Sequence, residues 1–307
     1  MLYRLLGTTG LRVSEIGLGC AGYWGKKIFD EAEAVRLVHV AVDHGLTFFD
    51  TGPSYSGGNA EPRLGRALAG IKNRNDLVVA TKAGTRISAH GKLYKEWSAS
   101  GVRSSVEESI VRLKLDVLPM LQLHGPAIND LTDDLLETLT RLKDEGKIRH
   151  LSVNSHDTDV IEYVMTLPQF GAVMIDYNIL RPEREAILKK LGTQGVGVLA
   201  GMALAGGLYR KSRFSVRGLQ DVWYAARAWK RHRSHIGRGE LLRFINDEAD
   251  WTGAEIALAW VLRRPEVSCA VIGTTRMAHL IANLRASGRL IRDDMELRIS
   301  HAQSLFA

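Results

Sequence analysis

The sequence GLGCAG, residues 17–22, bears on the choice between two α/β folds that are both built on parallel strands. It has the spacing G-x-G-x-x-G and follows an apolar run, which is the pattern of a Rossmann phosphate loop. In that loop the third glycine opens a helix directly, so that the helix N-terminus meets the pyrophosphate. Here residues 23–29 continue as a loop, and the next helical pattern starts only at Asp30. The motif by itself therefore does not establish a Rossmann domain.

The rest of the chain alternates short apolar runs, rich in β-branched residues, with segments of helical period. Such alternation indicates βα units around a parallel sheet. The predicted strands are 14–20, 46–51, 77–82, 117–123, 148–154, 172–177, 197–203 and 268–273. The predicted helices lie near 30–44, 59–70, 101–115, 131–145, 157–167, 182–193, 252–263 and 277–287. Eight units predict a (β/α)₈ TIM barrel, since a Rossmann domain needs about six strands and a switch point.

Two further segments complete this α/β barrel prediction. Residues 2–16 are typical of a β-hairpin that turns at Thr8, Thr9 and Gly10 and plugs the lower mouth of the barrel. No linker rich in proline, glycine or serine divides the chain, so residues 1–307 are predicted to form a single domain. The long connection 205–250 follows the seventh strand at the catalytic face, where long loops often act as lids.

The composition indicates a soluble globular protein of the reducing cytoplasm. Of 307 residues, 45% are hydrophobic, which is enough for a large core. Cys20 and Cys269 lie in apolar runs and form neither a disulfide framework nor a CxxC pair. The N-terminus has no signal-peptide pattern, and the longest apolar run is too short and glycine-rich to span a bilayer. We therefore expect a cytoplasmic location and no membrane partner.

The net charge of +7 is concentrated in one segment. Residues 210–243 hold ten Lys or Arg against two acidic residues, together with Trp223, Tyr224 and Trp229. No helix-turn-helix, zinc-finger or RNP-like motif accompanies them, so nucleic acid is not an expected partner. Two interpretations stay open: a solvated basic segment, or a cover for an anionic cofactor or substrate.

Four polar residues follow the predicted strands at the end where barrel enzymes build their active sites. The second strand ends in the sequence FFDTGPSYS, which supplies Asp50 and then Tyr55, the third ends at Lys82, and the fourth leads into His124. Each residue also has a structural interpretation, as a cap, a packing ring or a solvated charge. As a set, Lys82 beside Tyr55 favours the phenolate, and Asp50 can hold the ammonium of Lys82. A tyrosine in that setting is a usable general acid.

The segments DTGPSY, NAEPRLGRAL, ATKAG, RSSVEESIVRLKLDVLPMLQLHGP and DEGKIRHLSVNS together resemble the aldo-keto reductase superfamily. The resemblance implies that Asp50, Tyr55, Lys82 and His124 form a catalytic tetrad. It implies an NADPH-dependent oxidoreductase that reduces an aldehyde or ketone to an alcohol, with the proton from Tyr55 and the carbonyl oriented by His124. GLGCAG then resembles the first barrel strand and its loop rather than a Rossmann turn.

The same resemblance implies where the cofactor and substrate lie. Arg276 at a helix N-terminus suits a phosphate, which favours NADPH over NADH. Four features depart from the family pattern: the usual Ser-Asn pair is reversed as Asn154-Ser155, Met174 replaces a usual Gln, Gly201 a usual aromatic residue, and Gly273 a usual Lys. Tyr23 and Trp24 are predicted to line the substrate mouth. The predicted cofactor-binding residues are Gly22, Asn154, Gly201, Leu204, Gly206, Gly273, Thr274, Thr275, Arg276, His279 and Asn283.

Two alternatives stay open besides the reductase. One is a redox-silent member of the same fold that binds nucleotide as a regulatory subunit. The other is a lyase or isomerase that uses Lys82 as a Schiff-base nucleophile. No HExxH-like spacing is present, so no metal is expected. The expected partner is a small carbonyl compound, which could be a sugar or natural-product carbonyl, and the sequence leaves its identity and the oligomeric state open.

Overall fold

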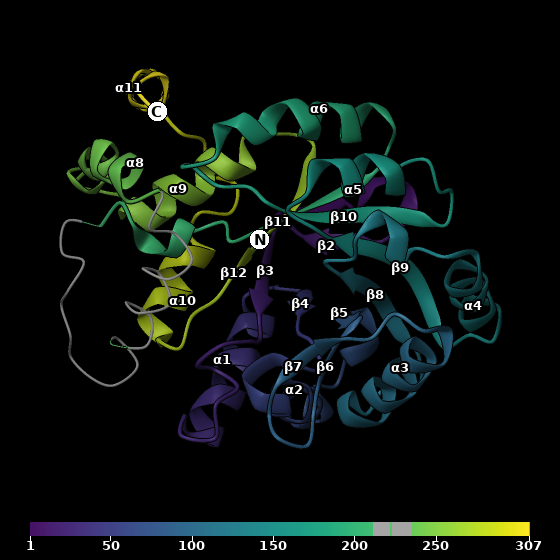
Figure 1. Cartoon of the computed structure of the whole chain (residues 1–307). Coiled ribbons are helices and arrows are strands. Elements are labelled where there is room, and N and C mark those ends of the chain that lie inside the picture. The colour runs from purple at the N-terminus through teal and green to yellow at the C-terminus, as the bar shows by residue number, and fades with distance from the viewer. Residues whose placement is uncertain (211–221, 223–234, 307) are drawn as a thin grey trace.

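The structure, a computed structural model, describes residues 1–210, 222 and 235–306, and within them eight parallel strands close into a barrel (Figure 1). The ring runs in chain order, with β12 returning to pair with β3. The TIM-barrel prediction is thereby confirmed. The strands are β3 (Ile16–Gly19), β4 (Phe48–Asp50), β5 (Val78–Ala83), β8 (Leu118–His124), β9 (Ile148–Asn154), β10 (Phe170–Asp176), β11 (Gly197–Gly201) and β12 (Val267–Ile272).

Helices surround the strands, as Figure 1 shows. Three of them begin at a residue whose side chain caps the helix: Asp30 accepts from the backbone N–H of Glu33, Thr132 accepts from that of Leu135, and Thr252 forms a capping box. The helices that follow the barrel strands are α1 (Glu31–Asp43), α2 (Ala60–Ala69), α3 (Ala99–Leu113), α4 (Asp133–Asp144), α5 (Thr158–Val164), α6 (Glu185–Thr193), α9 (Gly253–Leu262) and α10 (Met277–Leu284).

The glycines of GLGCAG serve strand packing and a turn. Gly17 and Gly19 belong to β3. A Cβ atom on Gly17 would lie 2.8 Å from Cys269 Sγ and 2.8 Å from Phe48 Cδ1, so only glycine fits inside the barrel there. Gly22 has a φ of +62° in the loop beyond the strand. No helix opens at this turn, which agrees with the rejection of a Rossmann loop.

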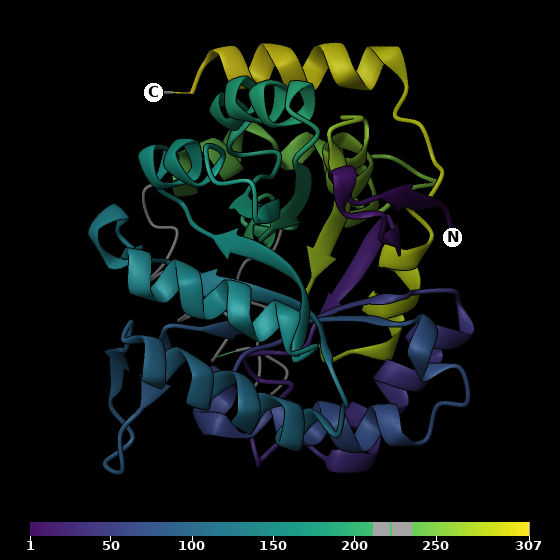
Figure 2. The same ribbon diagram turned by 90° about the vertical axis from the view of Figure 1, so that its right-hand side faces the viewer.

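The N-terminal hairpin forms as predicted, from β1 (Tyr3–Leu5) and β2 (Arg12–Ser14) paired antiparallel. Leu6 between them is fully buried against residues of the barrel interior. Gly7 approaches the start of β11 so closely that a Cβ atom there would overlap the backbone of Gly197. In Figure 2 this hairpin, in purple, lies at the opposite side of the barrel from the blue hairpin that follows β5. The hairpin therefore closes the end of the barrel away from the strand carboxyl termini.

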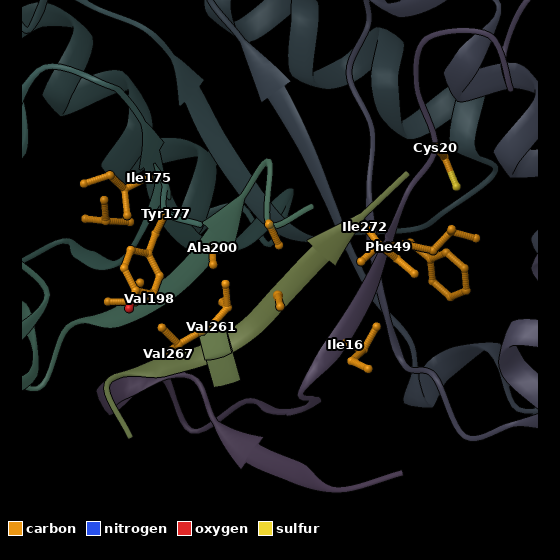
Figure 3. Close-up of a cluster of buried hydrophobic side chains, with 14 of the residues drawn as sticks. Ile16, Cys20, Phe49, Ile175, Tyr177, Val198, Ala200, Val261, Val267 and Ile272 are labelled. Carbon is orange, nitrogen blue, oxygen red and sulfur yellow. The ribbon is translucent and has the colours of Figure 1, made fainter. Parts of the chain in front are cut away.

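Two apolar layers hold the barrel together. The larger one fills the space between strands and helices, and Figure 3 shows part of it, including Ile16, Val198 and Ile272, along β3, β11 and β12. The smaller one lies inside the barrel and includes Phe48 and Met120. Side chains along a strand alternate between its two faces. The residues that follow a member of the interior layer at intervals of two therefore also point into the barrel.

Some elements lie outside the predicted βα pattern. After β5, the strands β6 (Thr85–Ile87) and β7 (Leu93–Lys95) form an antiparallel hairpin where a loop was expected. The helices α8 (Ile236–Leu241) and α11 (Asp293–Ser304) were not predicted either. No helix in the described ranges is long and apolar enough to cross a lipid bilayer.

The predicted lid at 205–250 is only partly described. Residues 211–221 and 223–234 lie outside the described residues. They include Trp223, Tyr224, Trp229 and most of the basic residues of segment 210–243. The proposals for a lid and for a basic cover therefore stay predictions.

Candidate active site

The barrel interior changes from apolar to polar toward the carboxyl ends of the strands. On β5, Val78 and Ala80 belong to the interior layer, and the next residue on that face is Lys82. On β8, Met120 is followed on the same face by Gln122 and His124. The polar side chains of these strands thus lie directly above the apolar floor.

Asp50 and Lys82 form the buried ion pair that the sequence predicted. The Nζ atom of Lys82 donates to Oδ1 of Asp50 at 2.5 Å and to the backbone oxygen of Thr51 at 2.8 Å. The side chain of Lys82 is 1% exposed and that of Asp50 is 9% exposed. A second donor, Nε2 of Gln122, reaches the same Oδ1 at 2.9 Å. The carboxylate is therefore held from two strands.

Burial and charge oppose each other in this pair. Burial alone would lower the pKa of Lys82, but the charge of Asp50 and hydrogen bonds with Asp50 and Tyr55 raise it above its ordinary value. Burial raises the pKa of Asp50, while Lys82 and the hydrogen bond from Gln122 act in the opposite direction. Lys82 thus stays an ammonium at neutral pH.

Tyr55 and His124 lie next to this ammonium. Lys82 Nζ is 4.8 Å from the centroid of the Tyr55 ring and shares a hydrogen bond with that side chain. The rings of Tyr55 and His124 meet edge to face, with centroids 5.6 Å apart. All four residues of the predicted tetrad therefore come together at one mouth, from β4, β5, β8 and the 3₁₀ turn Tyr55–Gly58.

The turn that carries Tyr55 is tied to the loop after β3. Ser56 has a φ of +59°, unusual for a residue other than glycine, and its Oγ donates to the backbone oxygen of Gly22 at 2.8 Å. Nδ2 of Asn59 donates to the backbone oxygen of Gly25, also at 2.8 Å. These hydrogen bonds join the turn that carries Tyr55, the general-acid candidate, to the neighbouring loop.

The structure separates the two residues predicted to contact substrate. Trp24 is 1% exposed, packs in the core, and its Nε1 donates to the backbone oxygen of Ala34 at 3.2 Å. Its ring is therefore a core element, and the prediction that it lines the mouth is not supported. Tyr23 is partly exposed, and its ring meets that of Phe29 edge to face with the centroids 6.0 Å apart. It stays a candidate for substrate contact.

Lys95 links the β6–β7 hairpin to the segment of His124. Its Nζ donates to the backbone oxygen of His124 and, at 3.1 Å, to that of Gly125. Burial lowers the pKa of Lys95, an effect that Asp130 partly offsets. The hairpin thus reaches the tetrad through the backbone of His124.

Across the mouth, on the predicted nicotinamide side, a side-chain amide lies against a thioether. Nδ2 of Asn154 lies 2.9 Å from Sδ of Met174. A Cβ atom on Gly201 would meet Met174 Cγ at 3.3 Å, so Met174 occupies the space beneath that glycine. Gly273 is exposed, and the nearest atom to a Cβ there would be 3.9 Å away. The position just past β12, at Gly273, is therefore the more open of the two.

The predicted phosphate residues gather where α10 begins. Arg276 is the N-cap residue of α10, and its backbone N–H donates to Oγ1 of Thr274 at 3.1 Å. A helix N-terminus beside an arginine suits an anionic group, so this donor set fits a cofactor phosphate. Thr274, Thr275 and Asn283 are largely buried, whereas the remaining predicted contacts are more accessible: Gly22, Leu204, Gly206 and His279.

Among the described residues, no group of three or more His, Cys, Asp or Glu side chains is arranged to hold a metal ion. Two residues that contact the tetrad were not predicted from the sequence, Gln122 and Lys95. Gln122 could have been found, because it lies two residues before His124 and a strand places both on one face. Lys95 carried no such signal, since the hairpin that positions it was itself not predicted.

A comparison with protein-family models matches residues 15–302 to the aldo/keto reductase family. Among curated proteins, the uncharacterized oxidoreductase YqkF of Bacillus subtilis is 26% identical over 310 residues, covering 99% of this chain and 97% of the relative. The L-galactose dehydrogenase of Arabidopsis thaliana is 34% identical over 220 residues, covering 67% of this chain and 66% of the relative.

Solved structures show the same fold. The holo form of the aldo-keto reductase AKR11C1 from Bacillus halodurans superposes with a TM-score of 0.81 at 26% identity, covering 98% of this chain and 96% of that one. The glycerol dehydrogenase AKR11B4 from Gluconobacter oxydans gives a TM-score of 0.82 at 22% identity, covering 99% and 95%. At that identity the second likeness concerns the fold alone.

Proposed function

The chain belongs to the aldo/keto reductase family, and we propose that it reduces an aldehyde or ketone to the alcohol with NADPH. The observation that carries the proposal is the contact of Tyr55 with Lys82, which is itself paired with Asp50. A phenol beside a buried ammonium is suited to give up its proton, because the ammonium stabilises the phenolate.

Each residue of the tetrad then has one task. The hydroxyl group of Tyr55 donates its proton to the carbonyl oxygen, and Lys82 compensates the negative charge left on the phenolate. Asp50 holds Lys82 in place. His124 orients the carbonyl and polarises it through a hydrogen bond. The bound nicotinamide supplies the hydride.

We assign the cofactor to the second half of the mouth. Asn154 would hold the nicotinamide amide, Gly201 and Gly273 would leave room for the ring and ribose, and Arg276 would bind the 2′-phosphate. The preference for NADPH over NADH rests on the position of Arg276 at the N-terminus of α10.

The substrate class that we propose is a polyhydroxylated carbonyl compound such as a sugar. A relative 34% identical over two thirds of the chain is described as acting on L-galactose. The tetrad hydroxyl, the imidazole and the partly exposed Tyr23 offer polar contacts that such a substrate can use.

The direct test is NADPH oxidation against a panel of aldoses, hydroxyketones and apolar aldehydes, with the cofactor deuterated at the transferred position. We expect deuterium on the former carbonyl carbon of at least one product. NADPH binding without turnover on any panel member would instead support the regulatory-subunit alternative. Borohydride trapping of a substrate adduct at Lys82 would support the Schiff-base alternative.

A further inference from the structure

Gln122 is a buried polar side chain that contacts the tetrad without belonging to it. It lies on β8, is 0% exposed, and is the register partner of Lys82 on β5. Its Nε2 donates to Oδ1 of Asp50 at 2.9 Å, the oxygen that also accepts from Lys82. One carboxylate oxygen thus takes two hydrogen bonds, one charged and one neutral.

The chemistry of the carboxylate fixes which way the amide points. An ionised carboxylate only accepts hydrogen bonds, so the NH₂ end of Gln122 faces Asp50 and the Oε1 end faces away. Within the described residues Oε1 finds no hydrogen-bond partner, and neither does the buried Oγ of Ser152. Gln122 and Ser152 are register partners on the adjacent strands β8 and β9.

The position of Ser152 suggests how the amide keeps this orientation. The two atoms make no direct hydrogen bond, but neighbouring strands lie about 4.8 Å apart, so one buried water can bridge the Ser152 hydroxyl and Oε1. A water that is held by Ser152 and donates to Oε1 would favour the orientation with NH₂ toward Asp50. The reverse orientation would place two acceptors against each other and leave the carboxylate with one donor fewer.

We propose that Gln122 is a positioning residue that keeps Asp50 ionised and thereby holds Lys82 charged against Tyr55, with Ser152 fixing the orientation of the amide. The part of this inference that concerns catalysis rests on the proposed reductase function. The part that concerns the ionisation of Asp50 does not depend on turnover and can be measured without substrate.

Other titratable groups face Asp50 but do not replace this donor. Lys82 on β5 is its ion-pair partner, and Tyr55 lies beyond Lys82. Cys20 after β3 and Cys269 on β12 are fully buried, and burial together with the charge of Asp50 raises the pKa of both thiols. They therefore stay neutral, as does the Gln122 amide itself. His124, two residues further along β8, packs against Tyr55.

The test measures the protonation of Asp50 in Gln122→Met, which keeps the length of the side chain and removes the donor. Loss of a hydrogen bond to the charged form raises a carboxyl pKa, here by about one unit. Infrared titration follows the band of the protonated carboxyl group, assigned by its absence in Asp50→Asn. We expect the band to appear at higher pH in Gln122→Met, and the acid limb of kcat/KM to move up by the same amount, a roughly tenfold loss on that limb.

A second Gln122 variant, a Ser152 variant and one control guard against a purely structural effect. Gln122→Glu keeps the shape but places a second acid beside Asp50, so the pair should take up a proton at higher pH than the wild type. Ser152→Ala should shift the titration in the same direction by less. Thr85→Val removes another buried oxygen that lacks a partner among the described residues, and it should leave the titration unchanged.

A wild-type Asp50 titration in both Gln122 variants overturns the proposal, even if turnover or thermal stability falls. A shifted titration in a protein that reduces no carbonyl on the panel supports the role of Gln122 and counts against the reductase assignment. The two proposals therefore fail in distinguishable ways.

Discussion

The two halves of the barrel mouth are built differently. In the half formed by β4, β5 and β8, the polar side chains bond to one another: Lys82 and Gln122 both donate to Asp50. In the half formed by β9 to β12, the inward positions carry Asn154, Met174, Gly201 and, just past β12, Gly273. There the Asn154 amide contacts the thioether of Met174, and Gly201 and Gly273 have no side chain at all.

The difference indicates how the two halves are used. Groups that satisfy each other inside the protein are preorganised, so they can act on a reacting atom without first rearranging. Groups with weak internal partners and open space beside them gain most from a ligand. Asp176 on β10 is the charged exception in the second half, and Arg181 and Arg184 neutralise it. We therefore expect substitutions in the first half to change chemistry and those in the second to change cofactor binding.

The largest effect is expected for Lys82→Met, which removes the ammonium that pairs with Asp50 in the preorganised half. It leaves the buried Asp50 without its charged partner and should cost about 3–5 kcal/mol of unfolding free energy. Turnover should fall by a factor of about 10³ or more, since the ammonium beside Tyr55 is gone. Denaturant unfolding and steady-state kinetics measure the two effects.

The double variant Asp50→Asn/Lys82→Met is the matched control. It removes both charges, so it should recover much of the lost stability while turnover stays low. If the double variant is no more stable than Lys82→Met, the ion pair is not the source of the loss.

The second half is tested by Arg276→Ala. Removing a charged hydrogen-bond donor should weaken NADPH binding by about 10- to 100-fold and leave NADH binding nearly unchanged. Fluorescence titration with each nucleotide measures this. The exposed Arg285, at the other end of α10, provides a control, and Arg285→Ala should bind both nucleotides as the wild type does. Equal loss of NADPH and NADH affinity would contradict the assignment of the 2′-phosphate.

The smallest effect concerns an ion network behind β5. Glu61 on α2, fully buried, accepts from Thr81, the neighbour of Lys82, and from Nε of Arg112 at 2.6 Å. Arg112 also bonds Glu108, which Arg86 contacts at 2.7 Å. Burial opposes the ionisation of Glu108, but these hydrogen bonds and that of Ser104 lower its pKa to about 2.

A carboxyl pKa that is lowered on folding stabilises the protein above the unfolded value of 4.5, and this contribution disappears as the pH falls toward 2. Glu108→Gln should therefore lower Tm by about 1–3 °C at pH 7, and the difference from wild type should shrink below pH 4.5. Calorimetry across pH measures this. Glu137→Gln, in an exposed pair 3.7 Å from Arg141, should have no measurable effect. A loss in Tm that persists undiminished at low pH would exclude the ionic origin.

The sequence predicted the barrel well because its repeating units are local. Strand β9 was predicted with its observed bounds, 148–154, and the ends of the other strands are displaced by a few residues. The four candidate residues could be located from the strand ends, since the carboxyl ends of barrel strands face one mouth, and the family resemblance then implied that they form a tetrad.

The remaining features depend on contacts between distant segments. Trp24 is apolar and follows a strand end, so it looks like a mouth residue, but a hydrogen bond to Ala34 and packing behind the loop place it in the core. Every residue of β7 is exposed, and its sequence Leu-Tyr-Lys shows no alternation of apolar and polar residues that would indicate a strand. In α11, the buried residues Met295, Ile299 and Ala302 do have helical spacing, but the helix lies outside the βα repeat from which the other helices were predicted.

The comparison of the two halves is tested most directly by Tyr55→Phe, assayed side by side for NADPH affinity and for carbonyl reduction. The substitution removes one hydroxyl from the preorganised half and nothing from the other. We expect turnover to fall by about 10²- to 10⁴-fold while the Kd for NADPH stays within about twofold of wild type. Turnover that survives in Tyr55→Phe, or NADPH affinity that falls together with it, would contradict this account.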